Sequence, residues 1–266
     1  MKWMTTLAVL MALGLGSQAM GQLFYDFYPR TSGGSPDGIS WENADNWYRY
    51  LVDNTDGGHY LYPPTLTDGG YGLTPYERPK NSAALAYIRD GRSVTIGSGV
   101  SGTALQVEVG SIPYQSAASG GTWLPRGAST LTIKTGGTLS TTSWGILIGN
   151  AYNGTMIMET GSLLNNVRLY LGNTSDTNPF GSATGTFLQY GGTQLSGKSQ
   201  WGRGLGGVGI YKQYGGFCTF VFNQMGAYLP EGQTVAGKAY YTLYDGTVQL
   251  RAFYLGMADH PESWVS

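Results

Sequence analysis

The sequence predicts an all-β protein, folded as a parallel β-solenoid with a turn-rich N-terminal cap. Its 266 residues include 43 glycines and 20 tyrosines, and only 12% of them are charged, a composition that suits short strands joined by tight turns. No ten-residue stretch has the periodicity of an amphipathic helix. The third observation is internal repetition, which favours a solenoid over the alternative fold, a β-sandwich.

The repetition consists of short words that end in glycine. The words "TLTIKTGG", "GTMIMETG", "GTFLQYGG", "GIYKQYGG" and "AYYTLYDG" end at Gly137, Gly161, Gly192, Gly216 and Gly246, at intervals of 24, 31, 24 and 30 residues. A small residue stands seven positions before each anchor: Thr130, Gly154, Gly185, Gly209 and Ala239. A second word follows three anchors, as "ILIGN", "LYLGN" and "FYLGM". The spacing predicts coils of about 24 residues, with loops inserted at one corner in the longer intervals.

Stacked coils place equivalent residues about 4.8 Å apart along the solenoid axis. The sequence therefore predicts that Tyr190, Tyr214 and Tyr244 form a ladder, and that the glycine pairs mark corners where a side chain would obstruct the turn. Cys218 is the only cysteine, and we expect it to be a buried small residue rather than half of a disulfide.

The chain divides into four segments. Residues 1–21 have the pattern of a secretory signal peptide, with Lys2, the apolar run "TTLAVLMALGLG" and a cleavage point after Ala19 or Gly21. Residues 22–82 are expected to form a cap, residues 83–258 the solenoid and residues 259–266 a tail. The segment "AALAYIRDGRSVTI" is interpreted as two strands around an Asp-Gly turn that begin the solenoid.

The two ends of the solenoid are expected to need covering, because a terminal coil exposes apolar surface and unpaired strand edges. At the N-terminal end we expect Trp41, Trp47 and Tyr48 to form a small core of the cap. At the C-terminal end, eight residues follow the last word, so we expect either that the protein is a truncated member of its family or that another copy covers the edge.

The side chains of the repeated words can be assigned to the two faces in either of two ways. In the first, Thr186, Leu188 and Tyr190 point inward, and an aromatic column with amides beside it is exposed and suited to stacking on sugar rings. The candidate glycan-binding residues are then Phe187, Gln189, Tyr211, Gln213 and Tyr241. The first assignment also turns Glu159 and Lys212 inward. The second buries Gln189 and Gln213, which is costly unless these amides are hydrogen-bonded.

The sequence offers no constellation for catalysis, for a metal or for a cofactor. Only two histidines are present, and "DNTDGG" lacks the ligand pattern of a calcium loop. Cys218 has no evident base, and the formal charge of −1 argues against a nucleic-acid partner. Glu159, Glu231 and Asp245 are among the few carboxylates of the repeat section from 127 to 257, and the first and last of these three fall in different columns three coils apart. We therefore expect no catalytic residues, no bound metal and no cofactor.

The words "SWENADNW", "SVTIGSGVSG", "STLTIKTGGTLS" and "ILIGN" resemble a group of secreted bacterial β-strand-repeat proteins, which are autotransporter-passenger-like and often end in a PEP-CTERM sorting tail. The resemblance spans roughly residues 37 to 257, and the ending "DHPESWVS" lacks the Pro-Glu-Pro word. It implies a non-catalytic secreted or cell-surface structural protein. The alternatives are a glycan-binding or adhesive protein and, third, a polysaccharide-degrading enzyme. Expected partners are extracellular polysaccharide, cell-surface components, or a second copy at the C-terminal edge.

Overall fold

A computed structural model describes residues 23–27, 37–51, 84–89, 91–111, 127–150, 152–173, 183–203, 206–226 and 237–255. The expected signal peptide, the tail at 259–266 and Glu231 lie outside these residues.

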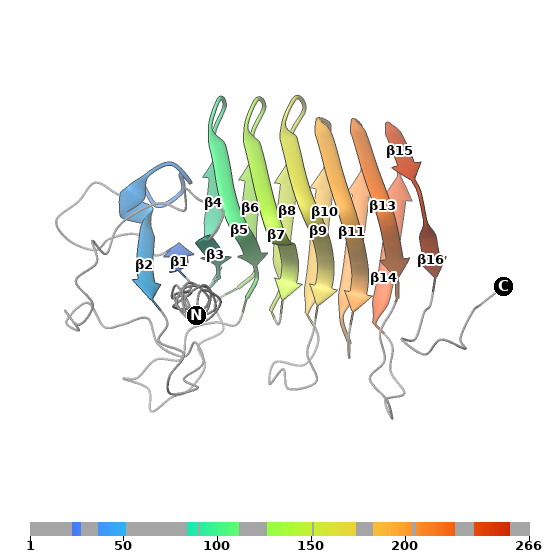
Figure 1. The fold of residues 1–266 in the computed structure, drawn as a ribbon, viewed down its shortest axis with the longest axis horizontal. Coiled ribbons are helices and arrows are strands. Elements are labelled where there is room, and N and C mark those ends of the chain that lie inside the picture. The colour runs from blue at the N-terminus through green and yellow to red at the C-terminus, as the bar shows by residue number, and fades with distance from the viewer. Residues whose placement is uncertain are drawn as a thin grey trace, which may run out of the picture.

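The described strands form two sheets that run side by side along one axis (Figure 1). The longer sheet, here sheet A, has the order β15-β13-β11-β9-β7-β5-β3-β1-β2, and β16 also pairs with β13. Its strands are β1 (Leu23–Phe27), β2 (Trp47–Leu51), β3 (Ala84–Ile88), β5 (Ser101–Val109), β7 (Thr138–Asn150), β9 (Leu163–Asn173), β11 (Thr193–Arg203), β13 (Phe217–Met225), β15 (Thr247–Leu250) and β16 (Phe253–Leu255). Sheet B has the order β14-β12-β10-β8-β6-β4. Its strands are β4 (Ser93–Ile96), β6 (Ser129–Ile133), β8 (Gly154–Met158), β10 (Thr184–Gln189), β12 (Val208–Gln213) and β14 (Lys238–Leu243).

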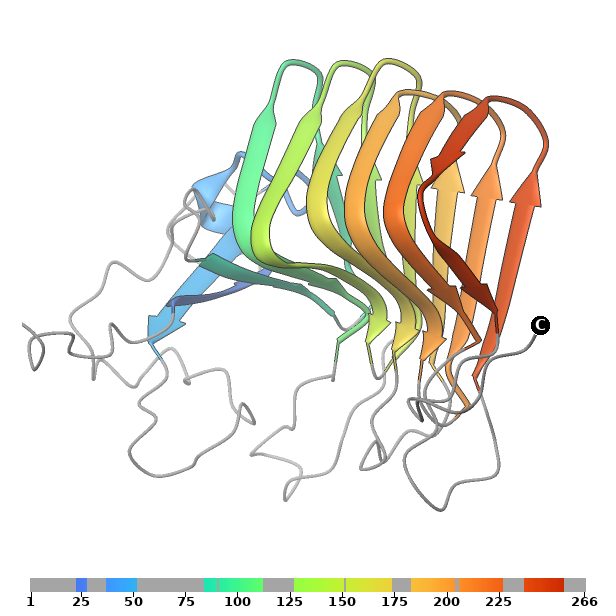
Figure 2. The ribbon, with the colours of Figure 1, turned by 45° about the vertical axis from the view of Figure 1, so that its right-hand side comes forward.

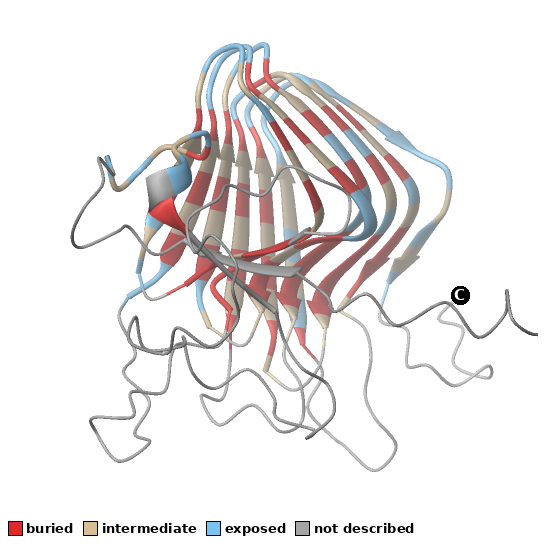
Figure 3. Ribbon diagram, turned by 60° about the vertical axis from the view of Figure 1, so that its left-hand side comes forward, coloured by how far each residue is buried: buried red, intermediate tan, exposed pale blue. Residues whose placement is uncertain are grey.

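Every strand pair is parallel except β1 with β2, so the predicted parallel β-solenoid is confirmed. Figure 2 shows the long strands of sheet A bending partway along their length. Sheet A therefore covers two sides of the solenoid and sheet B covers the third. Along the strands, buried side chains alternate with less buried ones (Figure 3), as expected when one face of each strand lines the core.

The register of the repeated words is as predicted in four of the five coils. Gly154, Gly185, Gly209 and Ala239 occupy one column across β8, β10, β12 and β14. In the first coil the prediction is wrong by one residue, because Ser129 rather than Thr130 opposes Gly154. The turn needs a glycine with positive φ. Gly136 fills that position at φ 74° and matches Gly161 at 73°, whereas in "QYGG" the second glycine does so.

Glycine is also required in the column from Gly154 to Gly209, because the two sheets approach each other closely at one corner. A Cβ added to Gly185 would overlap the carbonyl oxygen of Ile148 and crowd the backbone of Gly172. Gly209 makes a similar approach, since a Cβ there would lie 2.7 Å from the Gly202 nitrogen. The glycines of the first word and of the second word therefore face each other across a corner that has no room for side chains.

The N-terminal cap adds a final layer to both sheets. In sheet A, β1 pairs with β3 and antiparallel β2 then covers β1. In sheet B, the Thr95 nitrogen donates to the Ile39 carbonyl (2.7 Å) and the Trp41 nitrogen donates to the Thr95 carbonyl (2.8 Å). The segment predicted to contain two strands does so, but β3 and β4 belong to different sheets rather than to one hairpin.

The prediction that Trp41 and Trp47 are buried is confirmed, since both are fully buried with ring centroids 4.8 Å apart. They belong to the same apolar cluster as Ile96 and Leu139, so the cap shares the solenoid core instead of having its own. The side chain of Tyr48 lies outside the described residues. A short 3-10 helix, Ala44–Asn46, leads into β2, and the Trp47 Nε1 donates to the Trp41 carbonyl (2.9 Å).

Candidate functional site

The predicted glycan-binding column faces the core. Phe187 and Tyr211 have no exposed surface, and Tyr241 is partly buried against them. Phe187 and Tyr211 oppose each other in register with an edge-to-face contact at 4.7 Å, and Tyr211 makes another with Tyr241 at 5.3 Å. The prediction that this column is exposed is wrong, and these residues cannot present rings to a saccharide. The second face assignment holds.

The two glutamines assigned to the same site are also buried, and their amides are hydrogen-bonded. Gln189 donates from Nε2 to the carbonyls of Gly192 (3.4 Å) and Phe217 (3.2 Å). Gln213 donates in the same way to Gly216 and Thr247, at 3.3 Å each. Each amide therefore joins its own corner to the next coil. Because the Tyr211 hydroxyl donates to Gln189 Oε1 (2.6 Å) and the Tyr241 hydroxyl to Gln213 Oε1 (2.7 Å), the amide oxygens are satisfied as well.

Cys218 completes this buried cluster. Its thiol donates to Gln213 Oε1 at 3.3 Å, and burial raises the pKa of the thiol to about 11. A thiol that stays protonated at neutral pH is a poor nucleophile. The prediction of Cys218 as a buried small residue is confirmed. Burial likewise raises the pKa of Tyr211 well above its ordinary value, so the hydroxyl acts as a hydrogen-bond donor.

The predicted tyrosine ladder exists, and it lies on the outer face. Tyr190 stacks on Tyr214 at 4.9 Å with an interplanar angle of 11°, and Tyr214 stacks on Tyr244 at 4.7 Å and 3°. All three side chains are exposed. Because neighbouring rings cover each other, the ladder presents ring edges and hydroxyls to solvent along its length. A free ring face remains only where the stack ends.

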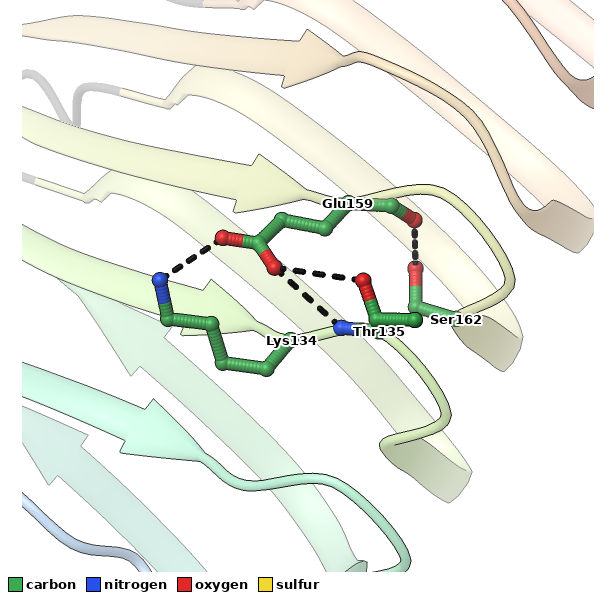
Figure 4. A network of polar contacts seen from close by, with 4 residues as sticks. All are labelled: Lys134, Thr135, Glu159 and Ser162. Atoms are coloured by element: carbon green, nitrogen blue, oxygen red, sulfur yellow. Dashed lines mark hydrogen bonds and ion pairs between the residues drawn. The ribbon is translucent and has the colours of Figure 1, made fainter.

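The same outer column continues toward the N-terminus as an ion pair (Figure 4). Glu159 accepts from Lys134 Nζ at 2.7 Å through Oε1, and from the Thr135 nitrogen at 3.2 Å through Oε2. The Ser162 hydroxyl donates to the Glu159 carbonyl (2.5 Å). The hydrogen bond from Lys134 holds the pKa of Glu159 below its ordinary value. This carboxylate is therefore engaged in joining two coils.

Glu159 and Asp245, two carboxylates within the described coils, do not converge. Glu159 is in register with Tyr190, three coils before Tyr244 and Asp245, which is about 14 Å at the usual strand spacing. Glycoside hydrolysis needs two carboxylates roughly 5–10 Å apart. Among the described residues, no three His, Cys, Asp or Glu side chains gather where they could hold a metal ion.

A partly buried polar ladder that the sequence analysis missed follows the second word. Glu108 is buried and accepts from Gln106 Nε2, from the Ser111 hydroxyl (2.7 Å) and from Asn150 Nδ2 (2.7 Å). Asn150 Oδ1 accepts from Asn173 Nδ2 (2.7 Å), and Asn173 Oδ1 accepts from Arg203 (3.3 Å). Burial raises the pKa of Glu108, against the opposing effect of these donors and of Arg89. The asparagines that close "ILIGN" and "LYLGN" were the signal for this ladder.

The C-terminal coil has an open edge. Among the described strands, β14 pairs only with β12, and β15 and β16 pair only with β13. A groove of about 370 Å³ between β13 and β15 is lined by Thr219, Phe220, Val221, Gln249, Leu250 and Arg251. The large apolar residues Leu243, Leu250, Phe253 and Leu255 are exposed here.

None of the described residues forms a helix that is long and apolar enough to cross a membrane. No family model, curated protein or solved structure matches the chain. The function must therefore be inferred from the residues and their geometry alone.

Proposed function

We propose that the protein is a non-catalytic structural protein that is secreted or displayed at the cell surface. The observation that carries this proposal is the use made of the polar side chains. Gln189, Gln213 and the ladder from Glu108 to Arg203 direct their hydrogen bonds at neighbouring coils rather than at a cavity. Such contacts favour a rigid, elongated scaffold.

Catalysis would require a different arrangement. Cys218 is buried and protonated, and Glu159 is paired with Lys134 of the neighbouring coil. A polysaccharide-degrading enzyme is the third candidate. It would be supported if the purified chain released reducing ends from polysaccharides and if Glu159→Gln or Asp245→Asn abolished that release.

The proposed location rests on the N-terminal apolar run and its small-residue cleavage point. The test is to express the full chain in a Gram-negative host and to sequence the N-terminus of the protein recovered outside the cytoplasm. Cleavage after Ala19 or Gly21, with the chain accessible to added protease on intact cells or found in the medium, is the expected result. Retention of an uncleaved chain in the cytoplasm would contradict the proposal.

Glycan binding is the second candidate, and the tyrosine ladder is the observation that favours it. The outer hydroxyls of Tyr190, Tyr214 and Tyr244 form a regular row that can hydrogen-bond to a linear polysaccharide. Replacing all three with Ala should abolish retention on polysaccharide resins while leaving the core intact. Phe187, Tyr211 and Tyr241 are unsuitable for this test, because replacing them would damage the core. Unchanged retention of the ladder variant would discard this candidate.

A further inference from the structure

The C-terminal coil is built like an interior coil. Its inward-facing residues stand in register with buried residues of the coil before it: Leu243 with Gln213, Val248 with Cys218, Leu250 with Phe220, Phe253 with Asn223 and Leu255 with Met225. The terminal residues are at least as apolar as their buried neighbours. A terminal coil adapted to face water would carry polar residues on its open side.

The exposure of these residues comes from their position alone. Leu255 is 60% exposed, whereas Met225 one coil earlier is 8% exposed. The backbone groups along the free edges of β14, β15 and β16 also lack strand partners among the described residues. An open edge with apolar side chains beside it is a template for pairing with another chain.

The opposite end of the solenoid does not fit this edge. Its core is covered by Trp41 and Trp47, and its sheet A ends in the antiparallel strand β2.

We propose that two copies of this chain join by their C-terminal edges about a two-fold axis perpendicular to the solenoid axis. The rotation makes the facing edge strands antiparallel, with β14 against β14 and β15 against β16 of the other copy. This interface is self-complementary, so it closes with two copies instead of growing into a filament. The proposal does not depend on the function proposed above.

Inward-facing and outward-facing side chains alternate along β14, and this alternation determines which register of β14 against β14 is allowed. Inward residues must oppose inward residues, since a slip by one would turn core side chains outward. A two-fold axis at Tyr241 satisfies this condition, because it places Ala239 opposite Leu243 and Tyr240 opposite Thr242. The same register brings Lys238 of one copy beside Tyr244 and Asp245 of the other, so like charges do not face each other. The two cores then become continuous across the interface.

The first experiment measures the mass of the purified chain by sedimentation over a range of concentrations. We expect a dimer with no larger species, and we expect Leu243→Asp to weaken dimerisation by about 30-fold or more. The matched control is Leu195→Asp, because Leu195 is exposed on sheet A away from the edge. A chain that stays monomeric at all concentrations, or masses that keep growing with concentration, would overturn the proposal.

The second experiment tests the register with residues on the outer face of β14, so that the core side chains stay in place. The proposed register sets Tyr240, which is 52% exposed, opposite Thr242 of the other copy. Mild oxidation of a mixture of Tyr240→Cys and Thr242→Cys chains should therefore yield a disulfide-linked dimer. A mixture of Tyr240→Cys with Thr186→Cys, on the outer face of β10, should yield none, and Cys218 is buried. Equal cross-linking of the two mixtures, or none in the first, would contradict the register and with it the two-fold arrangement.

Discussion

At the N-terminal end of the solenoid the last inward-facing side chains are covered, whereas at the C-terminal end side chains of the same kind lie open to solvent. Trp41 and Trp47 close the first end, and Asn46 fixes the loop that carries them. Its amide donates to Asp37 (2.6 Å) and to the Ser40 carbonyl (2.9 Å), and its oxygen accepts from the Gly38 nitrogen (2.9 Å). The C-terminal end has Leu243 and Leu255 where such a cover would lie.

The difference shows that coil stacking and end protection are separate problems. Each interior coil is stabilised by neighbours on both sides, so the same sequence pattern serves throughout. An end needs residues that no repeat supplies, such as the paired tryptophans and the buried asparagine. The described residues of the C-terminal coil include no equivalent of them, and the stability of this coil is expected to depend on what covers it.

The largest expected effect is the loss of the N-terminal cover. Trp41→Ala should reduce the free energy of unfolding by about 3–5 kcal/mol, because it opens a cavity between the cap and the first coils. Urea denaturation would measure the change. Trp144→Ala is the control, since Trp144 is 48% exposed and its loss should stay within about 0.5 kcal/mol. Equal effects of the two substitutions would show that the cap does not stabilise the solenoid.

The second prediction compares one column in two neighbouring coils. Phe220→Ala should cost about 3–5 kcal/mol, because Phe220 is buried by coils on both sides. Leu250→Ala, in register with it on the open coil, should cost about 1 kcal/mol when it is measured at a concentration where the chain is monomeric. If the two costs were similar under those conditions, the C-terminal coil would already be covered within one chain.

The third prediction uses the tyrosine ladder. Tyr214 stacks on two rings and Tyr244 on one, so Tyr214→Ala should be more destabilising than Tyr244→Ala. The expected difference is about 0.5–1.5 kcal/mol, the contribution of one aromatic pair beyond burial. Thermal or urea unfolding of both variants would measure it. An equal loss would indicate that the stacked rings contribute nothing beyond their contact with the sheet.

The smallest effect concerns pH. Near the N-terminal end the solenoid buries the carboxyl of Glu108, whereas near the C-terminal end it buries neutral amides such as Gln213. Burial raises the pKa of Glu108 above its ordinary value of 4.5, so its contribution to stability is present below that value and is lost as pH rises through the raised pKa. Glu108→Gln should therefore flatten the fall in stability between acid and neutral pH, as measured by urea unfolding at several pH values.

Glu159→Gln is the matched control, because the contribution of Glu159 to stability has the opposite pH dependence. Because Lys134 lowers the pKa of Glu159, this carboxylate contributes stability above its ordinary pKa, and the contribution is lost as pH falls. Both side chains of the pair are partly exposed to solvent, so the change should stay within about 0.5 kcal/mol. A Glu108→Gln variant with the same pH profile as the unmodified protein would mean that burial does not perturb Glu108.

The sequence by itself determined the solenoid, the column from Gly154 to Ala239, the tyrosine ladder and the buried state of Trp41, Trp47 and Cys218. These features follow from spacing and residue type, because stacked coils align equivalent residues in columns whichever way the side chains point. The tertiary structure decided the rest. Both faces of the repeated words carry aromatics, so only packing settles which face is inward. Gln189 and Gln213 can be buried because their partners include carbonyls of the next coil, and no local pattern reveals those partners.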